Sequence, residues 1–155
     1  MKRLLTVFAA MLMSCTNTPS QKASGMQKSV EILVSESQGG ADQAGFRIIK
    51  DEKDFQNSIR QSFGVIDMEK EPAIDYPKFP KNKKVVLYNL GSFRSGSHRI
   101  TEIKTVYVSN NILYVEVPAG EPSGGMEIQV ISNPWFVFAV PSDYQFNSVE
   151  LKYSK

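Results

Sequence analysis

The single histidine of the chain, His98, lies in the stretch SFRSGSHRI, and three serines are close to it: Ser92, Ser95 and Ser97. A serine hydrolase needs a serine, a histidine and usually a carboxylate brought together in space. Neighbours within one turn rarely approach each other in that way, and no Gly-x-Ser-x-Gly stands between a strand and a helix. The stretch is more typical of a turn that leads into a strand, so we expect no catalytic residue in it.

The sequence supports a metal or cofactor site no better than it supports a serine hydrolase site. A zinc or iron site uses two or more His or Cys ligands, and the chain has one of each. Asp51, Glu52 and Asp54 could ligate calcium, but they lie at an expected helix start, where acidic residues are common in any case. The glycine pairs at 39–40 and 124–125 do not open a helix in a phosphate-binding frame. We expect no metal and no cofactor.

The first fourteen residues predict an export signal, because a basic start (Lys2, Arg3) precedes a short apolar run. The run is too short for a stable membrane span. The tetrapeptide Leu12-Met13-Ser14-Cys15 resembles the lipobox of bacterial lipoproteins, which implies cleavage before Cys15 and lipidation of its thiol. The alternative is an ordinary secretory signal. We expect a protein of the bacterial cell envelope that is anchored through Cys15 to a membrane, the outer membrane by preference, and faces the periplasm or the cell surface.

Charge and cysteine content narrow the function classes. The chain has 18 basic and 16 acidic residues, and loss of Lys2 and Arg3 with the signal would leave equal numbers. Such a balance, without a basic stripe, argues against nucleic-acid binding. With one cysteine the chain can form no internal disulfide, so its core must be stable by packing alone.

The mature chain divides into a tether and a domain. Residues 15–45 are mostly polar and predict a lipidated Cys15 followed by a flexible tether. Within it, Val30–Ser35 could form a strand, but Ser35–Gly45 breaks any periodicity. We therefore expect the folded domain to span residues 46–155.

Within this domain the sequence predicts one helix and a set of strands. Phe55, Ile59 and Phe63 recur at the spacing of one helical face and predict a helix over 52–63. Asn110-Asn111 predicts a tight hairpin turn, and the run PWFVFAV predicts a central strand covered on both faces. Strands are expected at 46–49, 84–91, 98–109 (with a bulge), 112–117, 126–132, 134–140 and 149–153. The predicted fold is α+β, with a mostly antiparallel sheet shaped as a sandwich or half-barrel and one helix near the N-terminal end.

The order of these segments resembles one known family. The stretches PAIDYPKFPKNKKVVLYNLG, VYVSNNILYVEVPAGEPSGG and SNPWFVFAVP are similar to segments of the C-terminal domain of PrcB-type protease-complex lipoproteins. The likeness covers roughly residues 46–140. Gly96 aligns with a glycine of the family's Gly-Gly-Tyr turn, whereas His98 stands where the family has tyrosine. The resemblance implies a non-enzymatic accessory subunit that stabilises a surface protease complex.

Two loops offer a surface for such a partner. SFRSGSHR and the loop at 118–125 flank a predicted hairpin, so we expect both to lie toward one end of the sheet. They would form a mixed-charge rim of Arg94, His98, Arg99 and Glu121, with Gly96, Asn110 and Asn111 determining the turns. The second hypothesis is a ligand-binding lipoprotein that recognises a glycan or a peptide, for which Trp135 could stack on a sugar. A hydrolase is the third hypothesis.

Overall fold

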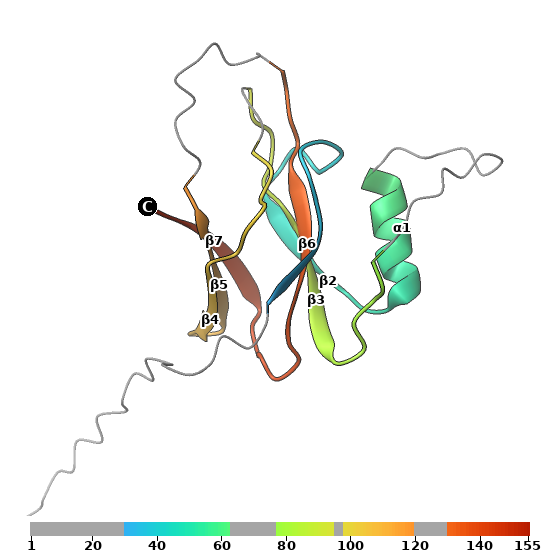
Figure 1. Cartoon of the computed structure of the whole chain (residues 1–155), viewed down its shortest axis with the longest axis vertical. Coiled ribbons are helices and arrows are strands. Elements are labelled where there is room, and N and C mark those ends of the chain that lie inside the picture. The colour runs from blue at the N-terminus through green and yellow to red at the C-terminus, as the bar shows by residue number, and fades with distance from the viewer. Residues whose placement is uncertain (1–29, 63–76, 95–97, 120–129) are drawn as a thin grey trace, which may run out of the picture.

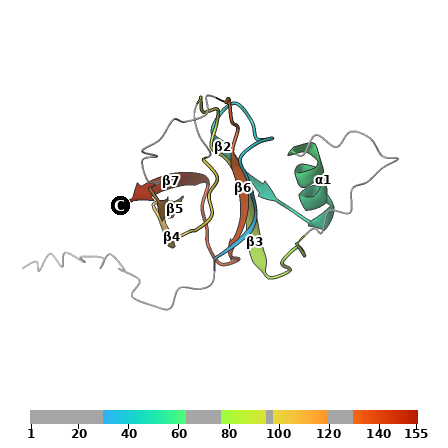
Figure 2. The ribbon, with the colours of Figure 1, turned by 45° about the horizontal axis from the view of Figure 1, so that its top comes forward.

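The computed structural model describes residues 30–62, 77–94, 98–119 and 130–155, and these form three layers. The middle layer is a four-stranded antiparallel sheet in the order β1-β6-β3-β2. Helix α1 covers one of its faces and a three-stranded sheet in the order β4-β5-β7 covers the other (Figures 1 and 2). The predicted α+β class is confirmed. The elements are β1 (Glu31–Glu36), β2 (Gly45–Ile49), α1 (Glu52–Ser62), β3 (Lys83–Asn89), β4 (Thr105–Ser109), β5 (Ile112–Pro118), β6 (Trp135–Pro141) and β7 (Ser148–Ser154).

Strand β6 is the centre of the domain, as its continuous apolar run predicts. Every residue from Trp135 to Val140 is buried. Alternate side chains belong to two cores, because successive residues of a strand point to opposite faces. Trp135, Val137 and Ala139 pack toward α1 together with Phe55 and Ile59. The other three side chains pack toward the three-stranded sheet: Phe136, Phe138 and Val140.

The predicted hairpin turn is also confirmed. Asn110 and Asn111 have φ angles of 51° and 61°, and they connect β4 to β5 with Ser109 opposite Ile112. Asparagine tolerates this left-handed conformation better than most residues, and two consecutive left-handed residues match the twist of a two-residue hairpin. The β5–β7 pair, by contrast, is parallel, so the second sheet is mixed.

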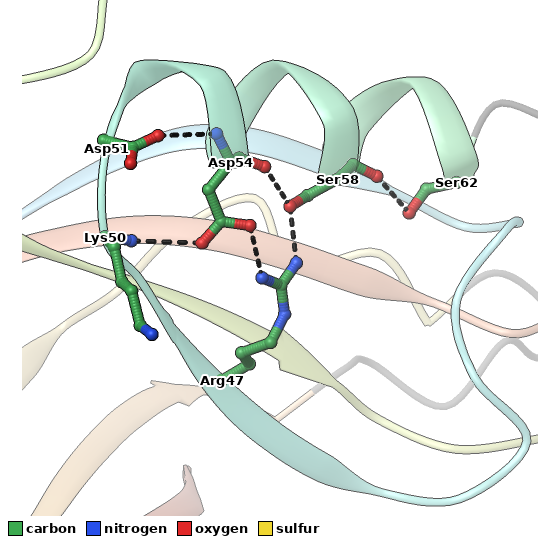
Figure 3. A network of polar contacts seen from close by, with 6 residues as sticks. All are labelled: Arg47, Lys50, Asp51, Asp54, Ser58 and Ser62. Atoms are coloured by element: carbon green, nitrogen blue, oxygen red, sulfur yellow. Dashed lines mark hydrogen bonds and ion pairs between the residues drawn. The ribbon is translucent and has the colours of Figure 1, made fainter.

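Helix α1 begins where the sequence places it, and hydrogen bonds define its start (Figure 3). The Asp51 carboxylate accepts a hydrogen bond from the Asp54 backbone N–H at 2.8 Å, and the Asp54 carboxylate accepts one from the Lys50 N–H at 3.1 Å. This reciprocal arrangement satisfies backbone donors that a helix start leaves unpaired. Arg47 of β2 then donates to the Asp54 carboxylate at 2.6 Å and to the Ser58 hydroxyl, which ties the helix to the sheet.

We predict that Arg47→Met raises the pKa of Asp54. The hydrogen bond from Arg47 is the main reason that the pKa of Asp54 lies below 3.8, its ordinary value. A lowered carboxyl pKa stabilises the fold above that ordinary value, and the contribution disappears as the pH falls through the folded-state pKa. The wild type should therefore exceed the variant in stability near neutral pH, by less than about 1 kcal/mol because the pair is partly exposed, and lose this advantage in acid.

Carbon-detected NMR titration of the carboxyl groups measures this pKa directly. Lys53→Met removes the same charge from the residue next to Asp54, and Lys53 does not contribute to the Asp54 shift. That control should leave the titration of Asp54 nearly unchanged. An equal effect of both substitutions would show that the general charge of the helix start, and not the Arg47 contact, lowers the pKa.

The predicted strand over 98–109 is correct only for its second half. Residues 98–104 contain no strand, because they carry the chain from the end of the four-stranded sheet to β4 in the other sheet (Figure 1). Ile100 is buried and Ile103 is partly buried in the core between the sheets. Near β4 the Lys104 N–H donates to the Glu116 carbonyl oxygen at 2.8 Å. The apolar residues that suggested a strand are therefore explained by core packing without regular pairing.

The predicted domain start at residue 46 is wrong. Strand β1 (Glu31–Glu36) pairs with β6 and forms an edge of the four-stranded sheet, with a register shift between Ile32 and Val34. The domain therefore includes at least residues 31–45, although their composition predicts a tether. The periodicity of the sequence does not reveal that β1 belongs to the domain. The loop after β1 is rich in Gly and polar residues, which is typical of a linker, yet it packs on the domain. Of the strand expected at 126–132, residues 126–129 lie outside the described ranges, and Ser132 forms only an isolated bridge.

In the part of the chain that the structure describes, we find no helix with the length and apolar character needed to cross a membrane.

Candidate functional site

Three segments meet at one end of the four-stranded sheet, which we call the loop end. The register places Glu36, the end of β1, and Asn89, the end of β3, beside Trp135, the start of β6. Gly45, the start of β2, lies beside Asn89. The loop end is thus formed by residues 37–44, 90–94 and 130–134, and it lies in the upper part of Figure 1.

Backbone hydrogen bonds join the three segments. The N–H groups of Phe93 and Ser132 donate to each other's carbonyl oxygens at 2.8 and 2.9 Å. The Leu90 N–H donates to the Pro134 carbonyl at 2.9 Å, and the Gly40 N–H to the Asn133 carbonyl at 2.8 Å. Each of these bonds fixes backbone positions that would otherwise be free to vary. The loop end is consequently a defined surface and not a set of independent loops.

Polar side chains complete these connections. Asn133 Nδ2 donates to Asp42 Oδ1 at 2.9 Å and to Ser92 Oγ at 2.7 Å. Ser92 Oγ lies 3.2 Å from the same carboxylate oxygen of Asp42, to which it donates. The hydroxyl of Ser92 is therefore used in a structural network with an amide and a carboxylate.

The structure places two predicted contact residues together at this end. The His98 ring stacks on Phe93, with ring centres 3.8 Å apart and planes inclined by 25°. Arg94 directly follows Phe93 and is exposed, as is Arg99. Gly96 and Glu121 lie outside the described residues, so the predicted roles of both stay predictions. Asn110 and Asn111 belong to the turn of the other sheet and are not part of this surface.

Sequence reasoning missed the exposed apolar residues of the loop end. Val130 is 48% exposed and Ile131 is 67% exposed. The strand predicted over 126–132 is absent at these two residues. Instead, Ile131 is held by a hydrogen bond from Gln38 Nε2 to its carbonyl oxygen at 3.2 Å, which leaves the side chain in solvent. No local pattern in the sequence signals this contact, because 93 residues separate Gln38 from Ile131.

Trp135 cannot stack on a sugar in this structure. Its side chain is 1% exposed, and Nε1 donates to the Gln38 carbonyl oxygen at 2.8 Å. Phe136 and Phe138 are also fully buried. The aromatic residues that prompted the glycan hypothesis therefore belong to the two cores.

A second cluster, made of two tyrosines and a lysine, lies on β4, β5 and β7. Tyr107 and Tyr114 are cross-strand partners whose rings stack with centres 5.1 Å apart. Lys152 Nζ lies 3.7 Å from the ring centre of Tyr114 and 3.0 Å from the Tyr107 hydroxyl, and this hydrogen bond raises the pKa of Lys152. The cation is therefore already bound to both rings, so this cluster is better explained as stabilisation of the sheet surface.

Among the residues described, no group of three His, Cys, Asp or Glu side chains could hold a metal ion. The chain matches no family model, no curated protein and no solved structure.

Proposed function

We propose that this chain is a lipid-anchored, non-enzymatic protein of the bacterial envelope whose loop end binds another protein. The proposed partner class is an envelope or surface protease complex, in keeping with the sequence resemblance to PrcB-type accessory subunits. The observation that carries the proposal is the composition of the loop end. The bridge between Phe93 and Ser132 brings exposed Arg94 close to exposed Ile131, and His98, which stacks on Phe93, is followed by exposed Arg99.

This composition is that of a small protein-binding surface. Protein interfaces combine apolar residues at their centre with a polar rim, and arginine is enriched in them. The bridge between Phe93 and Ser132 brings the arginine-bearing segment to the segment of Ile131. Because hydrogen bonds fix both segments before binding, little ordering free energy would be lost when a partner binds.

The geometry favours a protein partner over a small ligand. A site for a small ligand is usually a concave, largely apolar pocket with a few converging polar groups. Here the polar groups Asp42, Ser92 and Asn133 converge on each other through hydrogen bonds. The apolar side chains Val130 and Ile131 extend into solvent instead. A peptide segment of a partner is thus a better candidate than a glycan.

We predict that Ile131→Asp lowers partner capture about tenfold or more, because a charge would replace a central apolar contact. The assay is crosslinking in membranes of cells that produce the full chain, followed by identification of the captured protein by mass spectrometry. The charge reversals Arg94→Glu and Arg99→Glu should weaken capture in the same direction. Since Ile131 is mostly exposed, thermal unfolding of the variant should match the wild type.

Ile48→Asp is the matched control. Ile48 is also exposed, at 38%, but lies in β2 on an edge of the four-stranded sheet. Capture of the same protein by this control and by the wild type, but not by Ile131→Asp, would support the proposal. Undiminished capture by Ile131→Asp and by both arginine variants would refute binding at the loop end.

A further inference from the structure

The chain enters the domain at the end opposite the loop end, which we call the tether end. Strand β1 starts at Glu31 beside Ala139, whereas it finishes at Glu36 beside Trp135. Lys83, the first residue of β3, pairs with Pro141, and Ile49, the last residue of β2, pairs with Val85. The helix start and the turn before β3 therefore belong to the tether end, in the lower part of Figure 1.

Lysines concentrate at the tether end. Two of them, Lys50 and Lys53, flank the helix cap, and both are exposed. Lys78 and Lys81 precede β3 and are exposed as well. We call these four residues the lysine group. In the described part of the chain, none of the four side chains takes part in an ion pair or a hydrogen bond.

Most of the described acidic residues of this end already form ion pairs or hydrogen bonds with groups other than the lysine group. Glu31 pairs with Lys83 at 3.1 Å, and Asp54 pairs with Arg47 at 2.6 Å. The Asp51 carboxylate caps the helix by accepting a hydrogen bond. Among the described residues, Glu52 and Asp143 are the other acidic residues of this end, and both are exposed. Within the described part of the tether end, the four cations of the lysine group therefore outnumber these two carboxylates.

The distance to a membrane would be short at this end. Residues 16–29 separate Cys15 from Val30, so the chain between them spans at most roughly 50 Å when fully extended. If Cys15 is acylated, the tether end is thereby kept near the bilayer. Clustered lysines are attracted to anionic headgroups within about one Debye length, roughly 10 Å at ordinary salt.

We propose that the lysine group docks the tether end on anionic lipid headgroups, and that this docking turns the loop end away from the bilayer. The inference rests on the lipid anchor of the proposed function. The tether end of the four-stranded sheet would then face lipid, and the loop end would face the protein partner.

The test uses the acylated product that cells make from the full-length chain. It is placed in lipid nanodiscs of two compositions, phosphatidylcholine alone and phosphatidylcholine with phosphatidylglycerol. An amine-reactive reagent modifies exposed lysines, and mass spectrometry gives the rate at each position. We expect Lys78 and Lys81 to react about threefold or more slowly in the anionic discs. High salt should abolish the difference. Lys104, exposed beside β4 in the other sheet, is the internal control and should react equally in both discs.

A double variant, Lys78→Glu with Lys81→Glu, separates docking from simple proximity. In it, the protection of Lys50 and Lys53 by anionic discs should disappear, whereas Lys104→Glu should leave it unchanged. Equal rates in both discs, or equal protection of Lys104, would overturn the docking while leaving the anchor intact. A chain without the acyl mass increment on Cys15 would overturn the anchor and the docking together, so the two failures are distinguishable.

Discussion

Replacing Gly39 with alanine should reduce the free energy of unfolding by about 3 kcal/mol. Gly39 has a φ angle of +90°, a backbone conformation that residues with a side chain rarely adopt. An added Cβ would lie 1.8 Å from the carbonyl oxygen of Ser62, at the end of α1. Neither the added Cβ nor the Ser62 carbonyl oxygen can move away by a side-chain rotation. The backbone of the β1–β2 loop or of the end of α1 must therefore move. Urea unfolding followed by the fluorescence of Trp135 measures the change.

Gly45→Ala is the control for this prediction. Gly45 does not have a positive φ, and a Cβ at this position would meet nothing within 4 Å. We expect its stability to change by no more than about 0.5 kcal/mol. If Gly39→Ala were as stable as this control, the close packing of the β1–β2 loop on the end of α1 would be refuted.

The same substitution should affect the loop end. Gly40, the next residue, donates its N–H to the Asn133 carbonyl, and the Ala41 N–H donates to Asn89 Oδ1 at 3.0 Å. Movement of the loop at Gly39 would displace these bonds, and with them the segment that presents Ile131. Gly39→Ala should therefore weaken partner capture although Gly39 is remote from the proposed contact residues in sequence.

The parts of the fold that the sequence predicts well have local causes. The hairpin at Asn110-Asn111 depends on two consecutive residues that tolerate positive φ. The start of α1 depends on Asp51 and Asp54, which are three residues apart. Strand β6 is identified by an unbroken apolar run. In each case the residues that decide the structure are neighbours in the chain.

The candidate site could not be predicted in the same way, because contacts between distant residues build it. Asp42 contacts Asn133 across 91 residues, and Ser92 contacts Asp42 across 50. The polar loop that supplies Asp42 has the composition of a linker, so the sequence suggested a tether there. The secondary structure at Ile100 is equally hard to predict. Ile100 covers the core from an irregular segment, and the apolar residues of such a segment follow neither the helix period nor the strand period. The contact roles of Arg94 and His98 stay predictions from the sequence, whereas the exposure of Ile131 is evident only in three dimensions.

Trp135→Ala should be the most destabilising single substitution of the domain, with a loss of about 4 kcal/mol. The ring lies between the four-stranded sheet and α1 and is 1% exposed, so truncation would leave a large cavity in that core. Trp135 also donates to the Gln38 carbonyl and thereby connects the core to the β1–β2 loop. Far-UV circular dichroism is the suitable probe of urea unfolding, because the variant has lost the only tryptophan of the chain.

Trp135→Phe separates the two contributions. Phenylalanine fills most of the space but cannot donate a hydrogen bond, which leaves the Gln38 carbonyl without that donor, so we expect a loss of about 2 kcal/mol. Amide hydrogen exchange should then accelerate in residues 37–42 more than in α1. Gln38→Ala is the control, since it keeps the backbone carbonyl that accepts from Trp135 and removes only the side-chain bond to Ile131. If Trp135→Phe and Gln38→Ala accelerated exchange equally, the indole hydrogen bond would not be what holds the loop end on the core.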